Sequence, residues 1–140
     1  MKSSLFVHKA PLKLQEHPVY KKAIKLYTLS RKLTRQLSSD TAILHMYTSS
    51  CEDYRTLDQL TMFSLSLAPK IALAQTARNY TDSLNHIESL EQNIQSLRSI
   101  CDQLVTRITH KRKAVIRIQK ELNALSVLQR NWQLSITQAN

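Results

Sequence analysis

Residues 87–108 read IESLEQNIQSLRSICDQLVTRI, and the fold class can be inferred from the spacing of their apolar side chains. Apolar side chains recur in it every three or four residues: Ile87, Leu90, Ile94, Leu97, Cys101, Leu104 and Ile108. This spacing is typical of the a and d positions on one side of an α-helix. The opposite side carries polar and charged residues: Glu88, Glu91, Gln92, Gln95, Arg98 and Asp102. A helix with one apolar side must pack against other helices.

Two earlier stretches with the same periodicity are predicted to be packing partners. A first helix should run from Pro18, because proline suits the first helical turn, to about Leu37. Its inner side consists of Val19, Ala23, Leu26, Ser30, Leu33 and Leu37. A second helix is expected at about residues 52–80. Its inner side consists of Tyr54, Leu57, Leu60, Ser64, Leu67 and Ile71. Pro69 should kink this helix, since proline lacks an N–H and clashes with the preceding turn.

The segment between these two helices, residues 38–53, allows two interpretations. In the first, Asp40 caps a short separate helix that contains the apolar residues of segment 43–47. In the second, the first helix simply continues and then breaks. In both cases residues 48–50 are the expected turn.

The opening stretch belongs to a third helix, which should be capped by Thr81-Asp82-Ser83 and end near Thr109. A charged junction follows at residues 110–113, His-Lys-Arg-Lys, without glycine or proline. We therefore expect a tight turn into a fourth helix. The inner side of that helix consists of Val115, Ile118, Leu122, Leu125, Gln129, Trp132 and Ile136.

The composition narrows the fold class. The chain has 140 residues, 42% of them hydrophobic, and contains no glycine. Rossmann and P-loop sites need glycine-rich turns, and tight β-hairpins favour glycine at positive φ. We therefore predict an all-α protein with an antiparallel up-down-up-down four-helix bundle over residues 18–140. Residues 1–17, which Pro11 interrupts, are predicted to form an N-terminal arm.

The net charge of +10 is unevenly distributed along the chain. Residues 1–39 hold nine Lys or Arg and one acidic residue, and residues 110–140 hold six and one. The middle, residues 40–109, holds five basic and eight acidic residues. Basic ends of this kind suit a polyanion such as nucleic acid, or an anionic membrane surface. They also suit a solvated basic face that only keeps the protein in solution.

First and last helices are antiparallel neighbours in an up-down-up-down bundle, so the two basic clusters should merge into one patch. An anionic partner would offset the repulsion within that patch. The candidate nucleic-acid-binding residues are Lys21, Lys25, Arg31, Lys32, Arg35, Lys111, Arg112, Lys113, Arg117 and Lys120. We expect no aromatic residue among these contacts, so phosphate recognition is favoured over base stacking or base readout.

The sequence shows no pattern typical of catalysis or metal binding. Glu88 and Glu91 lack the histidine spacing of ferritin-like sites. The histidines are scattered: His8, His17, His45, His86 and His110. Cys51 and Cys101 form no metal-binding pair, and Cys101 is interpreted as a small core residue. We expect no catalytic residue, no metal and no cofactor. With no signal peptide or membrane-spanning run, a cytoplasmic protein without a membrane partner is expected.

Several of these segments resemble a bacterial four-helix-bundle family. Residues 17–27, HPVYKKAIKLY, resemble its opening helix, and residues 55–60, RTLDQL, resemble the start of its second helix. Residues 87–107 resemble the third helix, and Trp132 resembles the tryptophan of the last. The family includes proteins encoded in ribosomal RNA intervening sequences and the accessory variability determinant of diversity-generating retroelements. The chain departs from it at Asn131, where glycine often precedes the tryptophan.

The resemblance implies a basic bundle that assembles into a ring-like homo-oligomer, a pentamer in the accessory-protein branch. It also implies binding to nucleic acid, as RNA or cDNA, and to a retroelement reverse transcriptase. The resulting hypothesis is a non-catalytic accessory protein that partners such a polymerase. A second hypothesis is a helical adaptor or chaperone for other proteins, whose basic face only solubilises it. A third hypothesis is that the chain is an enzyme.

Overall fold

The structure is a computed structural model. It describes the backbone of residues 14–48, 51–108 and 111–139, and the side chains of residues 14–37, 55–108 and 111–138. Nearly all of this backbone lies in the long helices α2 (Pro18–Thr48), α3 (Cys51–Thr76), α4 (Tyr80–Arg107) and α5 (Arg112–Ala139). None of the described residues lies in a β-strand. The predicted all-α class is therefore confirmed.

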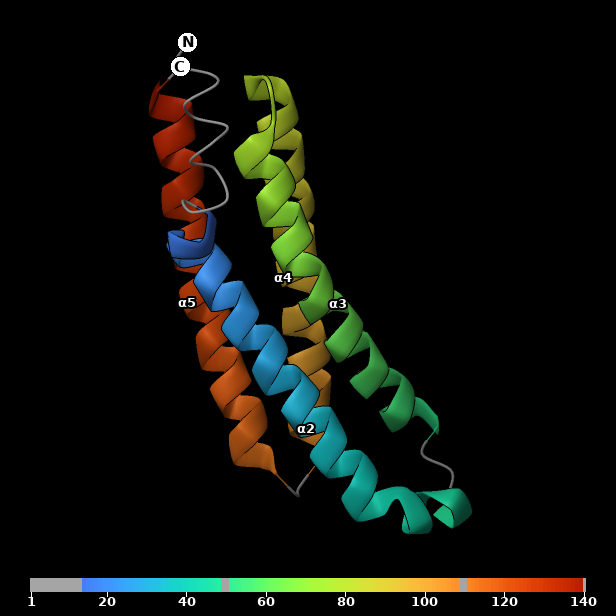
Figure 1. Cartoon of the computed structure of the whole chain (residues 1–140). Helices are drawn as coiled ribbons and strands as arrows, with labels where there is room; N and C mark the ends of the chain where they lie inside the picture. Colours follow the sequence, from blue (N-terminus) through green and yellow to red (C-terminus); the bar gives the residue numbers. More distant parts are fainter. Residues whose placement is uncertain (1–13, 49–50, 109–110, 140) are drawn as a thin grey trace.

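The helices form a bundle in which each one packs against two others (Figure 1). α2 contacts α3 and α5, and α4 contacts the same two helices. Buried apolar side chains from all of them make one core, against which Leu14 and Trp132 pack from the side. Leu14 belongs to the end of the predicted arm, and residues 1–13 of that arm lie outside the described residues.

The apolar side of α4 lies at the centre of this core, as its periodicity predicts. Its first six apolar positions are at most 2% exposed, and Ile108, just after the helix, is half-buried. Glu88 and Asp102 on the opposite side are exposed. Glu91 and Arg98 were expected to be solvated but are half-buried, because neighbouring helices also cover the flanks of this helix.

α2 confirms the predicted start of the first helix and its inner side, but not its end. It begins at Pro18, and the six inner residues from Val19 to Leu37 are all buried. The predicted end at Leu37 was wrong, since α2 continues to Thr48. Of the two interpretations of segment 38–53, the continuous helix is therefore correct.

The boundary between α3 and α4 also differs from the prediction. α3 ends at Thr76 and α4 begins at Tyr80, so residues 77–79 make the turn that was expected near residue 81. The N-cap is Asn79, whose side-chain oxygen accepts a hydrogen bond from the Asp82 N–H at 2.8 Å. Asparagine caps a helix as well as serine or aspartate does, which explains the displaced start.

Pro69 lies inside α3, and the helix continues through it to Thr76. One and a half turns earlier, the carbonyl of Phe63 accepts hydrogen bonds from Asn93 Nδ2 on α4 at 2.8 Å and from Ser66 Oγ at 2.9 Å. The same Nδ2 lies 2.7 Å from Ser66 Oγ. These bonds tie α3 to α4 near the position where proline removes a main-chain donor.

Candidate nucleic-acid interface

The candidate site lies where the first and last helices meet. The contacts between α2 and α5 occur in opposite order along the two helices. His17 packs edge-on against Trp132, with ring centroids 4.7 Å apart. Lys22 follows, 2.8 Å from Glu121. Beyond these contacts, the C-terminal half of α2 lies beside the start of α5.

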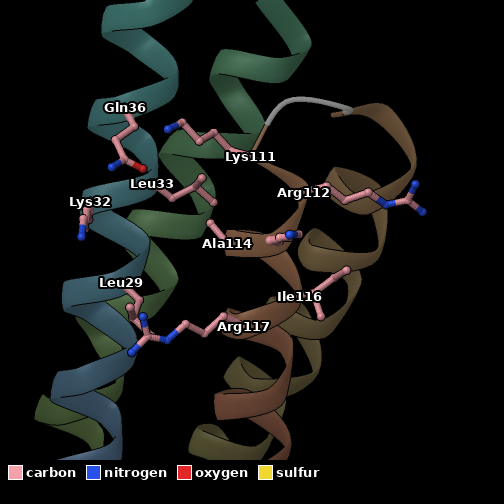
Figure 2. A pocket seen from close by; sticks show the side chains of 10 residues that line it. Leu29, Lys32, Leu33, Gln36, Lys111, Arg112, Ala114, Ile116 and Arg117 are labelled. Carbon is pink, nitrogen blue, oxygen red and sulfur yellow. The ribbon is translucent and has the colours of Figure 1, made fainter.

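A groove of about 770 Å³ opens between the helices at this last position. Its walls are Leu29, Lys32, Leu33 and Gln36 of α2, and Lys111, Arg112, Lys113, Ala114, Ile116 and Arg117 of α5 and the residue before it. Figure 2 shows Lys111 and Arg117 extending from the α5 side toward α2, while Arg112 extends away from it. We call this feature the α2–α5 groove. Five basic residues from two distant parts of the sequence line it.

A second hollow, of about 450 Å³, lies on the outer surface of α2. It is lined by Tyr27, Thr28, Arg31, Lys32, Arg35 and Gln36, and we call it the α2 hollow. Lys32 and Gln36 line both features, so the two adjoin. Together they form what we call the basic track. No acidic side chain is among the described residues that line it.

The structure places the ten candidate residues in three groups. Those that line the basic track are Arg31, Lys32, Arg35, Lys111, Arg112, Lys113 and Arg117. Lys21 and Lys120 are exposed but line neither hollow. Lys25 makes an ion pair with Glu121, 3.0 Å away. Its charge is therefore partly neutralised within the protein, and it is a poorer candidate than the sequence indicated.

Tyr27 was not predicted from the sequence, which led us to expect no aromatic residue at the site. It lines the α2 hollow beside Arg31, Lys32 and Arg35, and its side chain is half-buried. The sequence does contain the signal, because residues four apart share one side of a helix and Arg31 follows Tyr27 by four.

Glu121 forms an acidic end to the basic surface. It is the one acidic residue in segment 110–140, and its side chain is 16% exposed. Hydrogen bonds from Lys22 and then from Lys25 hold the pKa of the carboxyl below its ordinary value, so it stays ionised. The two ion pairs partly offset the basic charge on this part of α2, whereas no acidic side chain is among the described residues that line the basic track.

The turn into α5 gathers positive charge at an unfavourable place. Lys111 has φ 63°, and its carbonyl accepts the first hydrogen bonds of α5, from Ala114 and Val115. Among the described residues it alone has a positive φ, a conformation that costs an L-residue about 1–2 kcal/mol. Arg112 and Lys113 then occupy the first turn, where the helix dipole favours anions. A bound anion would offset the repulsion between these positive side chains and the positive end of the helix dipole.

The thiol of Cys101 and the metal-ligating residue types are candidate catalytic groups. Cys101 is buried in the core, and burial, followed by the charge of Asp102, raises the pKa of its thiol to about 12. Such a thiol is not a nucleophile at neutral pH. In the part of the chain that the structure describes, no three His, Cys, Asp or Glu side chains are placed to hold a metal ion.

His17, on the far side of Glu121 from the groove, has a structural role. Its Nδ1 accepts a hydrogen bond from the Val19 N–H at 3.2 Å, and its carbonyl accepts from the Lys21 N–H at 3.0 Å. Burial lowers the pKa of the imidazole. His17 therefore caps α2 in its neutral form and contacts Trp132.

None of the described helices combines the length and apolar character needed to cross a membrane. Comparisons with protein-family models, with curated proteins and with solved structures found no match to this chain.

Proposed function

We propose that this chain is a non-catalytic accessory protein that binds nucleic acid by its phosphates along the basic track. The observation that supports this most directly is that the two hollows adjoin. Seven basic residues line them, and no acidic residue is among their described lining. A surface of this kind attracts a polyanion, and phosphate contacts position a ligand without reading its sequence.

The energetic cost of the basic track also supports an anionic ligand. Lys32 and Arg117 face the same groove from different helices, and Lys111 adds a third charge beside a strained turn. Like charges gathered on one surface repel one another and oppose folding. Nearby, by contrast, Lys22 is paired with Glu121 within the protein. Release of condensed counterions from phosphates would drive binding.

We further infer that the helices form an antiparallel up-down-up-down four-helix bundle. Support comes from the order of the side-chain contacts. Ser30 Oγ lies 2.9 Å from Ser64 Oγ, and Thr34 Oγ1 lies 2.9 Å from Thr61 Oγ1, so residue numbers rise along α2 as they fall along α3. The contacts between α2 and α5 follow the same rule, and short connections favour antiparallel neighbours.

Self-association into a ring-like homo-oligomer, such as a pentamer, is part of the proposal. Met62, Leu65 and Leu73 lie on one side of α3 and are 48–65% exposed. An apolar surface on a single helix is typical of a subunit contact. Light scattering should give a mass several times 16.2 kDa, and Leu65→Glu should lower it. A monomer at every concentration would exclude the ring.

The family resemblance of residues 17–137 adds a protein partner, a retroelement reverse transcriptase. Its support is the order of features in the sequence, from the opening helix at His17 to Trp132. A reverse-transcriptase gene adjacent to the gene for this chain, together with co-purification of the two products, would test it. If the gene has other neighbours, the proposed polymerase partner is excluded, whereas the proposal that the chain binds nucleic acid is unaffected.

The experiment for the basic track compares two double charge reversals in fluorescence polarisation titrations of RNA and DNA oligonucleotides. Arg35→Glu with Arg117→Glu should abolish about two phosphate contacts. The log–log slope of affinity against salt should then fall by about 1.4–1.8. Both side chains are exposed, so the helical content by circular dichroism should not change.

The matched control is Arg78→Glu with Arg130→Glu, which makes the same charge change. Both residues are exposed. Arg130 lies about 27 Å along α5 from Arg112, at a rise of about 1.5 Å per residue. Arg78 lies in the α3–α4 connection, which Figure 1 places at the opposite end of the bundle from the α4–α5 connection. Equal losses in both double variants would show that no localised patch exists.

That result would favour the second candidate function, a protein-interaction adaptor. The observation in its favour is the same exposed apolar side of α3 that includes Met62 and Leu65. In an adaptor these residues bind another protein, and the basic track only keeps the chain in solution. Leu65→Glu would then abolish partner binding, whereas Arg117→Glu would leave it unchanged.

A further inference from the structure

Tyr27 sits at one end of the basic track, and its chemistry differs from that of every other residue there. It lines the α2 hollow with Thr28, Arg31, Lys32 and Arg35. From Tyr27 the track runs about 14 Å along α2 to Gln36, at a rise of about 1.5 Å per residue. Over most of that length the hollow runs beside the α2–α5 groove, whose α2 wall extends from Leu29 to Gln36 and which Lys111 and Arg117 enter from the other helix (Figure 2).

The half-burial of Tyr27 suits it to hold a planar ligand. Tyr27 is neither fully buried nor fully exposed, and it lines the hollow. A tyrosine restrained in this way offers a large flat surface at a low cost in side-chain entropy. Arg31, one turn further along α2, lies on the same side of the helix and lines the same hollow. An aromatic ring beside basic side chains is the combination that single-strand-binding surfaces use.

We infer that the basic track binds single-stranded nucleic acid, with one unpaired base stacked on Tyr27 and the adjoining phosphates held by Arg31, Lys32 and Arg35. This inference rests on the proposed nucleic-acid function and narrows its substrate class. The strand continues into the α2–α5 groove, where Lys111 and Arg117 contact further phosphates. A base within a duplex is already stacked on both faces, so a duplex can use the phosphate contacts but not Tyr27.

The test uses the full chain and three labelled ligands of equal length and label. They are a single-stranded oligonucleotide, the same strand with abasic sites throughout, and its duplex. The abasic strand keeps the phosphates and lacks the bases. The wild-type chain should bind the intact strand about tenfold or more tightly than the abasic strand, because a stacked base contributes that much affinity. This comparison needs no variant.

Three variants then assign the base contact to Tyr27. Tyr27→Leu keeps an apolar side chain and removes the ring, so affinity for the intact strand should fall about tenfold, to that of the abasic strand. Tyr27→Phe keeps the ring and should bind like wild type. Tyr80→Ala removes another half-buried tyrosine, at the start of α4, and should change nothing. Circular dichroism confirms that each variant is folded.

The outcomes separate this inference from the proposed function. If wild type and Tyr27→Leu bind intact and abasic strands equally, and Arg35→Glu with Arg117→Glu still weakens both, the phosphate site stands and stacking on Tyr27 is excluded. If no ligand binds in a salt-dependent way, both proposals fail. A preference for the intact strand that persists in Tyr27→Leu would place the base contact at another residue and overturn the inference.

Discussion

Glu121 on α5 accepts a hydrogen bond from Lys22 Nζ on α2 at 2.8 Å, although the two residues are 99 positions apart in the sequence. The other carboxylate oxygen lies 3.0 Å from Lys25 Nζ. This arrangement joins the first and last helices, and it divides their basic surface into a neutralised part and the basic track. Its removal should therefore affect both stability and binding.

We expect Glu121→Gln to strengthen nucleic-acid binding and to steepen its dependence on salt, because Lys22 and Lys25 become available to phosphates. Each of these lysines that binds a phosphate should add about 0.7–0.9 to the log–log slope. The free energy of unfolding should fall by about 1 kcal/mol or less, as is usual for partly exposed ion pairs. Glu88→Gln makes the same charge change on an exposed part of α4 and should alter neither quantity.

The same ion pairs should make stability depend on acid pH. The folded-state pKa of Glu121 is lowered from 4.5, so the unfolded chain binds the proton more readily. The stabilisation is therefore present above about pH 4.5 and is lost as the pH falls through the lowered folded-state pKa. Urea melts of wild type and Glu121→Gln should give free energies that converge in that range. A constant difference down to the lowest pH would contradict this account.

Leu97→Ala tests the central position of α4. The side chain is 2% exposed among core residues, so its truncation should lower the free energy of unfolding by about 2–5 kcal/mol through lost burial and a cavity. Glu88→Ala, exposed on the same helix, should change it by about 0.5 kcal/mol or less. Denaturant melts of both variants provide the measurement. Similar losses would mean that the helix is turned differently from its position here.

Asn93 tests the polar contact between α3 and α4. It is 3% exposed and donates to Phe63 O at 2.8 Å, so Asn93→Ala should leave a buried acceptor with fewer donors. We expect a loss of about 1–3 kcal/mol in a chemical melt. Gln95→Ala, exposed on the same helix, serves as the control. Asn93 lies next to the apolar stripe and was not identified from the sequence.

The titration of His17 should give a second pH dependence of stability, which begins at a higher pH than that of Glu121. Burial lowers its folded-state pKa from 6.5, so the unfolded chain binds the proton more readily as the pH falls below 6.5. Stability should therefore decrease from pH 6.5 down to the folded-state pKa and then level off. Protonation also removes the Nδ1 acceptor for Val19 N–H. His17→Asn keeps a capping side chain without titrating, so the wild-type minus variant difference isolates the effect.

Trp132 offers an independent readout of the same event. Its ring is in edge-on contact with His17, and it is the one tryptophan of the chain. Its emission should change with a midpoint below pH 6.5 in wild type, and this transition should disappear in His17→Asn. A midpoint at or above 6.5 would show that burial does not control the imidazole.

Lys111 separates strain from charge at the turn into α5. Lys111→Gly should stabilise the fold by up to about 1 kcal/mol, because glycine adopts φ 63° without the penalty of a side chain, although it gives the unfolded chain more freedom. The same change removes one charge from the α2–α5 groove, so binding should weaken. Lys113→Gly, inside the first turn of α5, should destabilise instead.

Local periodicity was sufficient to predict much of the fold. The spacing of Ile87, Leu90 and Ile94 determines which side of α4 is apolar. That side is buried regardless of which helices pack against it, so its burial could be predicted without the tertiary structure. The same reasoning correctly identified the inner side of α2 from Val19 to Leu37. Helix ends were predicted less well, because a cap such as Asn79 depends on one side-chain hydrogen bond that several residue types can make.

The order of residues along the chain was enough to predict the helices, their apolar sides and the excess of basic residues at both ends. Which charges meet depends on the packing of the helices. Lys25 pairs with Glu121, whereas Lys32 lines the same groove as Arg117. Tyr27 is a different case, because it and Arg35 lie on one helix, two turns apart, so their shared hollow follows from local periodicity. Periodicity reports the orientation of each residue about its own helix, whereas contacts between helices depend on how two helices are rotated and shifted against each other.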